Sequence, residues 1–172
     1  MTQTKVLKTA LILRGIPGAG KSTLARLRAL ACGLAAQDCV FNTDLLFDEF
    51  NAGVFSLGLL SQLHQVNLTR FIQAAARSMP LIVCDNTNTV QWEYMAYEAA
   101  ARALGYQVEV CVVGNPGDPE QVAQCITRNV RGVPANRVRD MAQRLVLSLA
   151  QEKATSSSRA QPGIPAQPAN SA

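Results

Sequence analysis

The sequence predicts an α/β fold with three layers, in which a parallel sheet of about four to five strands is flanked by helices. Four short apolar runs have strand character, namely ALIL at 10–13, CVF at 39–41, LIVC at 81–84 and VEVCVV at 108–113. Helical segments separate these runs, and this alternation is typical of parallel strands whose connecting helices cover both faces of a sheet. The chain has 172 residues, of which 48% are hydrophobic and 16% charged. We expect one domain with a substantial core over residues 1–152.

A glycine-rich loop, RGIPGAGKST at 14–23, follows the first run and contains the pattern G-x-x-x-x-G-K-S in full. Glycines let backbone N–H groups wrap a triphosphate, because no Cβ blocks the approach and positive φ is allowed. In such a loop Lys21 reaches the β and γ phosphates, and the Ser22 hydroxyl binds Mg²⁺. The residues expected to bind ATP here are Gly15, Pro17, Gly18, Ala19, Gly20, Lys21, Ser22 and Thr23. An ordinary glycine-rich turn is the alternative, but the buried strand before the loop favours a phosphate site.

The first helices follow from apolar spacing and from residues that end helices. Leu24, Leu27 and Ala31 recur at helical spacing behind the loop, and Gly33 is a helix stop. A second helix begins LLFDEF after Asp44, and a long helical segment, LGLLSQLHQVNLTRFIQAAARSM, occupies residues 57–79. The two connections between the first three strands are therefore helical.

The second half of the chain continues the pattern. A helix over QWEYMAYEAAARAL at 91–104 ends at Gly105, and Asp118 with Pro119 is a typical helix start after the fourth strand. Gly132 and Pro134 separate that helix from a last one. The apolar seam of the last helix consists of Val138, Met141, Leu145 and Leu149.

The segment 153–172 is rich in Ser, Pro, Ala and Gln, and we expect it to be a disordered tail. Pro162, Pro165 and Pro168 recur every third residue, so one edge of a polyproline helix could bind a partner protein. A solvated tail without a partner is the interpretation that we favour.

Composition also limits location and cofactors. The chain has no apolar run as long as a membrane span and no apolar secretory core at its N-terminus, so we expect a cytoplasmic protein without a membrane partner. The five cysteines include no C-x-x-C pair and are interpreted as small buried residues rather than as a redox or metal site. The single histidine, His64, is interpreted as a packed or solvated helix residue rather than as a catalyst.

Polar residues follow three of the four strands, at the edge of an α/β sheet where ligands bind. The second run leads into Asn42-Thr43-Asp44 and the third into the segment 85–88, DNTN. Phosphoryl transfer needs a metal and a carboxylate that takes the proton of the acceptor. We predict Asp44 as this base, with an N-cap of the following helix as its alternative role. Asp85 is predicted to bind Mg²⁺ or its waters, with a strand-end turn as the alternative.

The net charge of +4 is unevenly distributed. Residues 29–69 contain no Lys or Arg, whereas five arginines crowd a short stretch near the C-terminal end: Arg128, Arg131, Arg137, Arg139 and Arg144. Arg128 and Arg131 flank a Gly-Val-Pro break, so we predict a lid whose arginines close over the phosphates, with Arg128 catalytic and Arg131 binding ATP. The other three are interpreted as a solvated basic helix face.

Four motifs in this order resemble the P-loop kinases of the 5′-polynucleotide kinase type, often catalogued as AAA-like ATP-binding domains. They are RGIPGAGKST, NTD at 42–44, CDNTN at 84–88 followed by Trp92, and RNVRGVP at 128–134. The resemblance covers residues 10 to about 150 and implies a P-loop NTPase fold with an arginine-bearing helical lid, with ATP and Mg²⁺ as cofactors. It implies Lys21 and Ser22 for ATP and magnesium, Asp44 as general base, Asp85 near metal and acceptor, and Arg128 as lid arginine.

The acceptor side departs from that family. Polynucleotide-phosphorylating members carry an arginine shortly after the base, where this chain has Phe47. Phe47, Phe50 and Phe55 could stack a nucleic-acid base, although we favour the buried face of a helix for them. The expected function is transfer of the γ-phosphate of ATP to a hydroxyl, with a polynucleotide 5′-OH as first candidate acceptor. The alternatives are a small-molecule or sugar-nucleotide kinase, and a non-kinase ATP-binding module whose tail recruits a partner.

Overall fold

The computed structural model describes residues 7–159 and contains one parallel sheet of four strands in the order β2-β3-β1-β4. The strands are β1 (Thr9–Arg14), β2 (Val40–Phe41), β3 (Leu81–Asp85) and β4 (Gln107–Val112). The phosphate-loop strand β1 is therefore central, flanked by β3 and β4. The second strand is shorter than the run CVF predicts, because Cys39 is the last residue of a helical turn.

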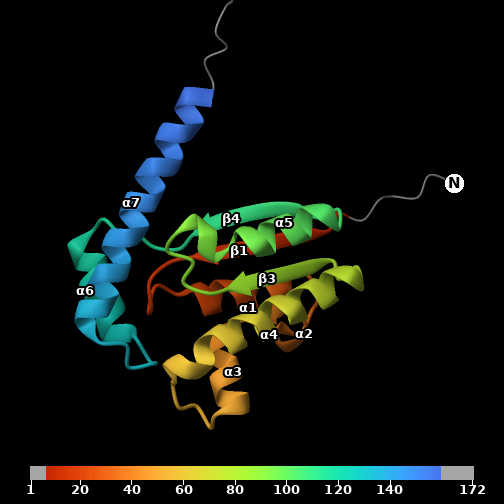
Figure 1. Cartoon of the computed structure of the whole chain (residues 1–172), viewed down its shortest axis with the longest axis horizontal. Helices are drawn as coiled ribbons and strands as arrows, with labels where there is room; N and C mark the ends of the chain where they lie inside the picture. Colours follow the sequence, from red (N-terminus) through yellow and green to blue (C-terminus); the bar gives the residue numbers. More distant parts are fainter. Residues whose placement is uncertain (1–6, 160–172) are drawn as a thin grey trace, which may run out of the picture.

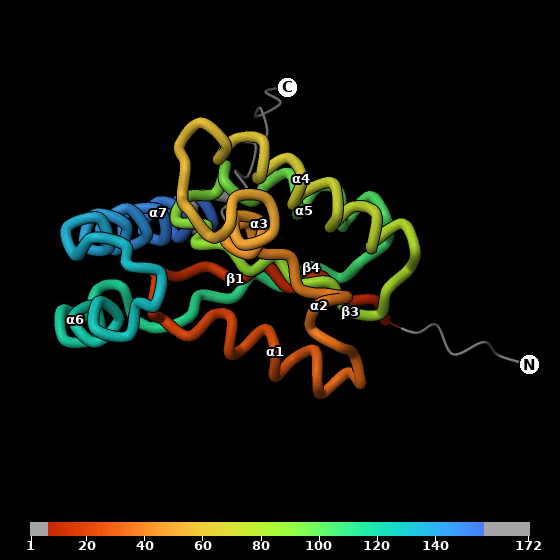
Figure 2. Tube along the Cα trace, turned by 90° about the horizontal axis from the view of Figure 1, so that it is seen from below, coloured from red at the N-terminus to blue at the C-terminus, as the bar shows by residue number. Residues whose placement is uncertain are grey.

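Helices cover both faces of the sheet and stand at its end. They are α1 (Lys21–Ala31), α2 (Ala36–Cys39), α3 (Thr43–Phe50), α4 (Leu57–Ala76), the 3₁₀ turn η1 (Gln91–Glu93), α5 (Met95–Ala103), α6 (Pro119–Arg128) and α7 (Ala135–Arg159). Figure 2 shows α1 on one side of the strands and α4 with α5 on the other. The expected three-layer α/β fold is confirmed.

Side-chain alternation along β1 builds two cores. Leu11 faces α1 and packs in one buried cluster with Ala25. Its neighbour Ile12 points to the opposite face and packs in a second cluster with Phe71 of α4 and Tyr97 of α5. Because the strand is buried on both faces, it reads as a continuous apolar run rather than as an alternating one.

The helices α6 and α7 lie beyond the carboxyl ends of the strands, where the arrowheads of β3 and β4 point (Figure 1). Ile16 of the glycine-rich loop packs in a cluster with Cys125 of α6 and Val138 of α7. Asp118 caps α6 as predicted, because its side chain accepts a hydrogen bond from the N–H of Glu120 at 2.9 Å. The lid helices are thus anchored on the phosphate loop itself.

The cysteines follow the prediction in part. Cys39, Cys84 and Cys125 are buried, as expected for small apolar residues, and burial raises the pKa of the Cys84 thiol to about 12. Cys111 is half-buried, and Cys32 is exposed at the end of α1, contrary to the prediction.

The last helix corrects the expected domain boundary at residue 152. α7 is 25 residues long and continues to Arg159, so residues 153–159 are helical. Hydroxyls of this segment bond to carbonyls one turn back, Thr155 to Gln151 at 2.9 Å and Ser156 to Glu152 at 2.8 Å. The remainder of the predicted tail, with its three spaced prolines, lies outside the described residues. No helix within residues 7–159 combines the length and the apolar character needed to cross a bilayer.

Candidate active site

The glycine-rich loop connects β1 to α1 in a conformation that only glycine adopts freely. Gly18 has φ +80°, and a Cβ built on it would stand 2.0 Å from the carbonyl oxygen of Cys125 in α6. Gly20, at φ +96°, precedes the first turn of α1. Lys21, Ser22 and Thr23 form that first turn, where backbone N–H groups have no partner within the helix. The loop therefore has the backbone that an anion site at a helix N-terminus requires.

Lys21 is folded into the loop and is only 9% exposed. Its Nζ donates a hydrogen bond to the carbonyl oxygen of Ile16 at 3.1 Å. Burial lowers the pKa of the ammonium, and the carboxylates of Asp85 and Asp44 oppose this shift. Lys21 therefore lies within electrostatic reach of both predicted site carboxylates.

Asp85 ends β3 as a buried carboxylate, 2% exposed. Its Oδ2 accepts a hydrogen bond from Nδ2 of Asn42 at 3.0 Å, whereas its Oδ1 is buried and makes no hydrogen bond with the described residues. Burial raises the pKa of this carboxyl, and the nearby Ser22 hydroxyl and Asn42 amide lower it in part. The unpaired Oδ1 of Asp85 and the nearby hydroxyl of Ser22 are oxygen ligands of the kind that Mg²⁺ prefers. Asp85 and Ser22 therefore fit the metal.

Asp44 lies in the first turn of α3 with its side chain exposed. The helix is capped by Asn42 instead, whose Oδ1 accepts from the N–H of Asp44 at 2.7 Å. The alternative role of Asp44 as N-cap is therefore wrong, because a second cap-forming residue stands two positions earlier. Asn42 bonds to both Asp44 and Asp85, and so fixes the spacing of the two acidic segments.

Further hydrogen bonds join the segments that follow the strands. Oδ1 of Asn86, after β3, accepts from the N–H of Thr43 at 3.0 Å, and Nδ2 of Asn88 donates to the carbonyl oxygen of Leu13 at 2.7 Å. The N–H of Gly15 donates to the carbonyl oxygen of Thr87 at 2.9 Å. The structure thus brings together the three strand-end segments that the sequence singles out.

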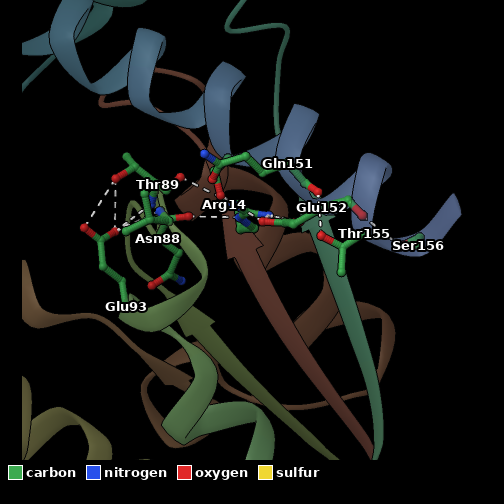
Figure 3. Close-up of polar contacts among 10 residues, drawn as sticks. Arg14, Asn88, Thr89, Glu93, Gln151, Glu152, Thr155 and Ser156 are labelled. Atoms are coloured by element: carbon green, nitrogen blue, oxygen red, sulfur yellow. Dashed lines mark hydrogen bonds and ion pairs between the residues drawn. The ribbon is translucent and has the colours of Figure 1, made fainter. Parts of the chain in front are cut away.

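Arg14 is a site-supporting residue that the sequence reasoning missed. It is 1% exposed and is the last residue of β1 and the first of the segment 14–23, and Figure 3 shows it between the loop after β3 and helix α7. Its Nε donates to the carbonyl oxygen of Asn88 at 2.9 Å, and its guanidinium bonds Ser148 at 3.0 Å and both carboxylate oxygens of Glu152 at 2.9 and 2.8 Å. The sequence signal for this role is a charged residue directly after the apolar run of β1, because a buried arginine needs an oppositely charged or hydrogen-bonding partner.

In this conformation the predicted lid arginines contact α6 and α3. Arg128 lies along α6, where its Nε donates to the carbonyl oxygen of Gln124 at 3.3 Å. Arg131 makes a bidentate ion pair with Asp48 of α3 at 2.8 and 2.9 Å. Arg144 pairs with Glu93 at 3.0 Å rather than pointing freely into solvent.

The three phenylalanines of the acceptor side differ in burial. Phe47 is 3% exposed, in agreement with a buried helix face. Phe50 and Phe55 are 54% and 61% exposed, so the prediction of a shared buried face is wrong for them. The rings of Phe55 and Phe47 contact each other at a tilt, with centroids 5.2 Å apart. The guanidinium of Arg70 lies over the ring of Phe50.

Known proteins resemble this chain in sequence and in fold. Human NEDD4-binding protein 2 is 28% identical over 137 residues, an alignment that covers 77% of this chain, and the chain spans only 7% of the length of that relative. A chain of the Pnkp1/Rnl/Hen1 RNA repair complex has a TM-score of 0.67 at 18% identity, covering 87% of this chain and 48% of its own length. The Mycobacterium tuberculosis APS kinase CysC, solved with AMPPNP and APS, has a TM-score of 0.51 at 14% identity, covering 84% of this chain and 98% of the kinase.

These likenesses confirm the P-loop fold. At 18% and 14% identity, the two solved structures show the fold alone. A family model described as an AAA domain matches residues 11–148, which is most of the chain. The match includes the glycine-rich loop, both acidic strand ends and the lid segment. The chain therefore belongs to the AAA domain family, as its ordered motifs implied.

Proposed function

We propose that the protein is an ATP- and Mg²⁺-dependent kinase that transfers the γ-phosphoryl group to a hydroxyl acceptor. The single observation that carries this proposal is the convergence of Lys21, Asp44 and Asp85. The ammonium is within electrostatic reach of a buried carboxylate suited to a metal and of an exposed carboxylate suited to a proton.

The chain's own residues hold the nucleotide. Backbone N–H groups at the start of α1 surround the β and γ phosphates, and Lys21 turns from the Ile16 carbonyl onto their oxygens. Ser22 and Asp85 would hold Mg²⁺, and the ion would supply positive charge to the phosphates. Arg128 and Arg131 close from the lid and stabilise the same charge.

Asp44 acts on the acceptor. Its carboxylate takes the proton of the hydroxyl while the hydroxyl oxygen forms a bond to the γ-phosphorus. The bond from the γ-phosphorus to the bridging oxygen breaks, ADP leaves, and the proton stays on Asp44 until solvent removes it. Asn42 holds the backbone of Asp44 and so fixes the direction of approach.

A polynucleotide 5′-OH is the first candidate acceptor. Support comes from the fold shared with a chain of an RNA repair complex over 87% of this chain. A small-molecule or sugar-nucleotide acceptor is the second candidate, and one observation favours it. Arg131 is paired with Asp48, and Phe47 stands where a phosphate-gripping arginine is found in the polynucleotide type, so the acceptor side offers little free positive charge.

The test is transfer of label from γ-labelled ATP to a 5′-OH oligonucleotide, with released phosphate scored alongside. We expect label on the oligonucleotide with the wild type and a loss of about 100-fold or more with Asp44→Ala, since a general base contributes that much. Glu49→Gln is the matched control, because it removes another exposed carboxylate of α3 that pairs with Arg70 outside the proposed site. A wild type that hydrolyses ATP but places label on no hydroxyl acceptor, at a rate that Asp44→Ala leaves unchanged, would overturn the kinase proposal.

A further inference from the structure

His64 contacts the segment that carries the proposed base. It lies in the first half of α4, and its Nδ1 is 3.2 Å from Oγ1 of Thr43, the residue before Asp44. Thr43 is 3% exposed, whereas His64 is exposed. α3 and the start of α4 lie side by side near the carboxyl ends of the strands, close to the lid segment (Figures 1 and 2). The ring therefore stands on the acceptor side of the site.

The contact with Thr43 couples the tautomer of the ring to the direction of the hydroxyl, which either donates to Nδ1 or accepts from an Nδ1–H. A buried hydroxyl needs a hydrogen-bond partner, and the backbone of Thr43 is already held by Asn86. When the hydroxyl donates to Nδ1, the proton of the neutral ring stays on Nε2. Desolvation of the ring lowers the pKa of His64, although Glu93 and Asp44 favour the charged form, and this shift favours the neutral ring.

The surroundings of the ring select the chemistry of its ligand. Asp44 of α3 and Glu93 of η1 are the carboxylates that act on it, and Glu93 is paired with Arg144 of α7. A neutral N–H donor beside an exposed carboxylate suits an uncharged oxygen better than a phosphate, because the carboxylate repels an anion. Sugar hydroxyl and ring oxygens have this character.

We propose that His64 is an acceptor-binding residue, whose Nε2–H donates a hydrogen bond to a sugar oxygen next to the hydroxyl that Asp44 deprotonates. The inference rests on the proposed kinase function and narrows its substrate class to acceptors that present a sugar. Thr43 is the positioning residue that holds the ring in the required tautomer.

The first test separates binding of the acceptor from binding of ATP. For a 5′-OH oligonucleotide, His64→Ala should raise the KM about tenfold, the effect of one hydrogen bond, while the Kd of ATP changes less than twofold. His64→Gln keeps an N–H donor and should restore most of the affinity. Gln65→Ala, an exposed neighbour on α4, is the matched control and should leave the KM unchanged.

The second test observes the tautomer directly. His64 is the single histidine of the chain, so ¹⁵N-histidine NMR reports on this ring alone. We expect a neutral Nε2–H ring at pH 7, and a mixture of tautomers with a KM raised a few fold in Thr43→Val, which keeps the shape of the side chain but removes its hydroxyl.

Two results would overturn the inference while leaving the kinase proposal intact: label transfer by the wild type with an unchanged KM in His64→Ala, or a ring protonated at Nδ1 at pH 7. A wild type that labels only acceptors without a sugar would also overturn this inference and leave the kinase proposal intact, whereas a wild type that hydrolyses ATP and labels no hydroxyl acceptor at all would overturn both.

Discussion

Asp85 is the residue at which the stability of the chain and its proposed chemistry conflict. Its carboxylate is 2% exposed, and one of its oxygens has no partner among the described residues. Burial raises its pKa, so the folded chain holds a proton over a pH range in which the unfolded chain has already lost it. Above the raised pKa the ionised carboxylate therefore destabilises the metal-free fold.

Asp85→Asn should make the metal-free protein more stable at neutral pH by about 1 kcal/mol, because it removes a buried charge and keeps an acceptor for Asn42. The advantage should shrink as the pH falls through the raised pKa, where the wild-type carboxyl becomes neutral as well. Urea unfolding of both proteins across pH 4–8, without Mg²⁺, measures this difference. A variant less stable than the wild type at every pH would show that the charge is compensated.

Gly18 is the position where a single methyl group should disturb the phosphate loop. Gly18→Ala places its Cβ against the Cys125 carbonyl of α6 and strains a backbone at φ +80°, so we expect a loss of about 2–3 kcal/mol of stability and weaker ATP binding. Gly33→Ala is the matched control, because Gly33 also has positive φ but nothing within 4 Å of its Cβ. Thermal unfolding and ATP titration compare the two. Equal losses would mean that backbone strain alone, rather than the contact with α6, accounts for the effect.

At the scale of elements, one ion pair joins the lid to the acceptor side. Arg131, in the loop between α6 and α7, holds Asp48 of α3, one turn after Asp44. Both side chains are exposed by more than a third, so solvent and salt screen the attraction and the pair is weak. ATP phosphates could compete for an arginine held this weakly.

Asp48→Asn should therefore tighten ATP binding by up to about fivefold, because it frees Arg131 for the nucleotide. Arg131→Ala should weaken binding, and the double variant should behave like Arg131→Ala alone. Calorimetric titration with ATP at low salt measures all three. An Asp48→Asn protein with unchanged affinity, or a double variant that still binds more tightly, would place Arg131 outside the ATP site.

The elements were predictable where their signals are local. The glycine-rich loop and Gly105 stand at element ends as predicted, because both depend on a few neighbouring residues. The cap of α3 is Asn42 and not Asp44, for which capping is the alternative role in the sequence. Both are good cap residues, and only the folded geometry decides between them. The order of the strands and the exposed rings of Phe50 and Phe55 depend on tertiary packing, which periodicity does not contain.

Across the whole molecule, Arg14 and Glu152 join the first strand to the last helix over 138 positions of sequence. No local sequence pattern indicates that Glu152 is the partner of Arg14, because the two residues are far apart in the chain. The sequence therefore predicts the motifs of the site but not the contacts that hold them together. Through Asn88 and Thr89, the same arginine reaches the loop that begins at Asp85. The strand that leads into the glycine-rich loop, the loop after β3 and α7 therefore share one buried charge.

Removal of Glu152 should destabilise the whole domain, because it leaves the buried Arg14 without its carboxylate. Glu152 is itself 31% exposed and Arg14 keeps Ser148, so we expect a loss of about 2 kcal/mol for Glu152→Ala, less than for a fully buried pair. Gln151→Ala, an exposed neighbour on α7, is the control. Truncation after Leu147, which removes both partners of Arg14 on α7, should cost more than truncation after Lys153, which keeps them. Urea unfolding of these four variants measures their free energies of unfolding. A Glu152→Ala variant as stable as Gln151→Ala would show that the Arg14–Glu152 pair contributes no more than an ordinary surface ion pair.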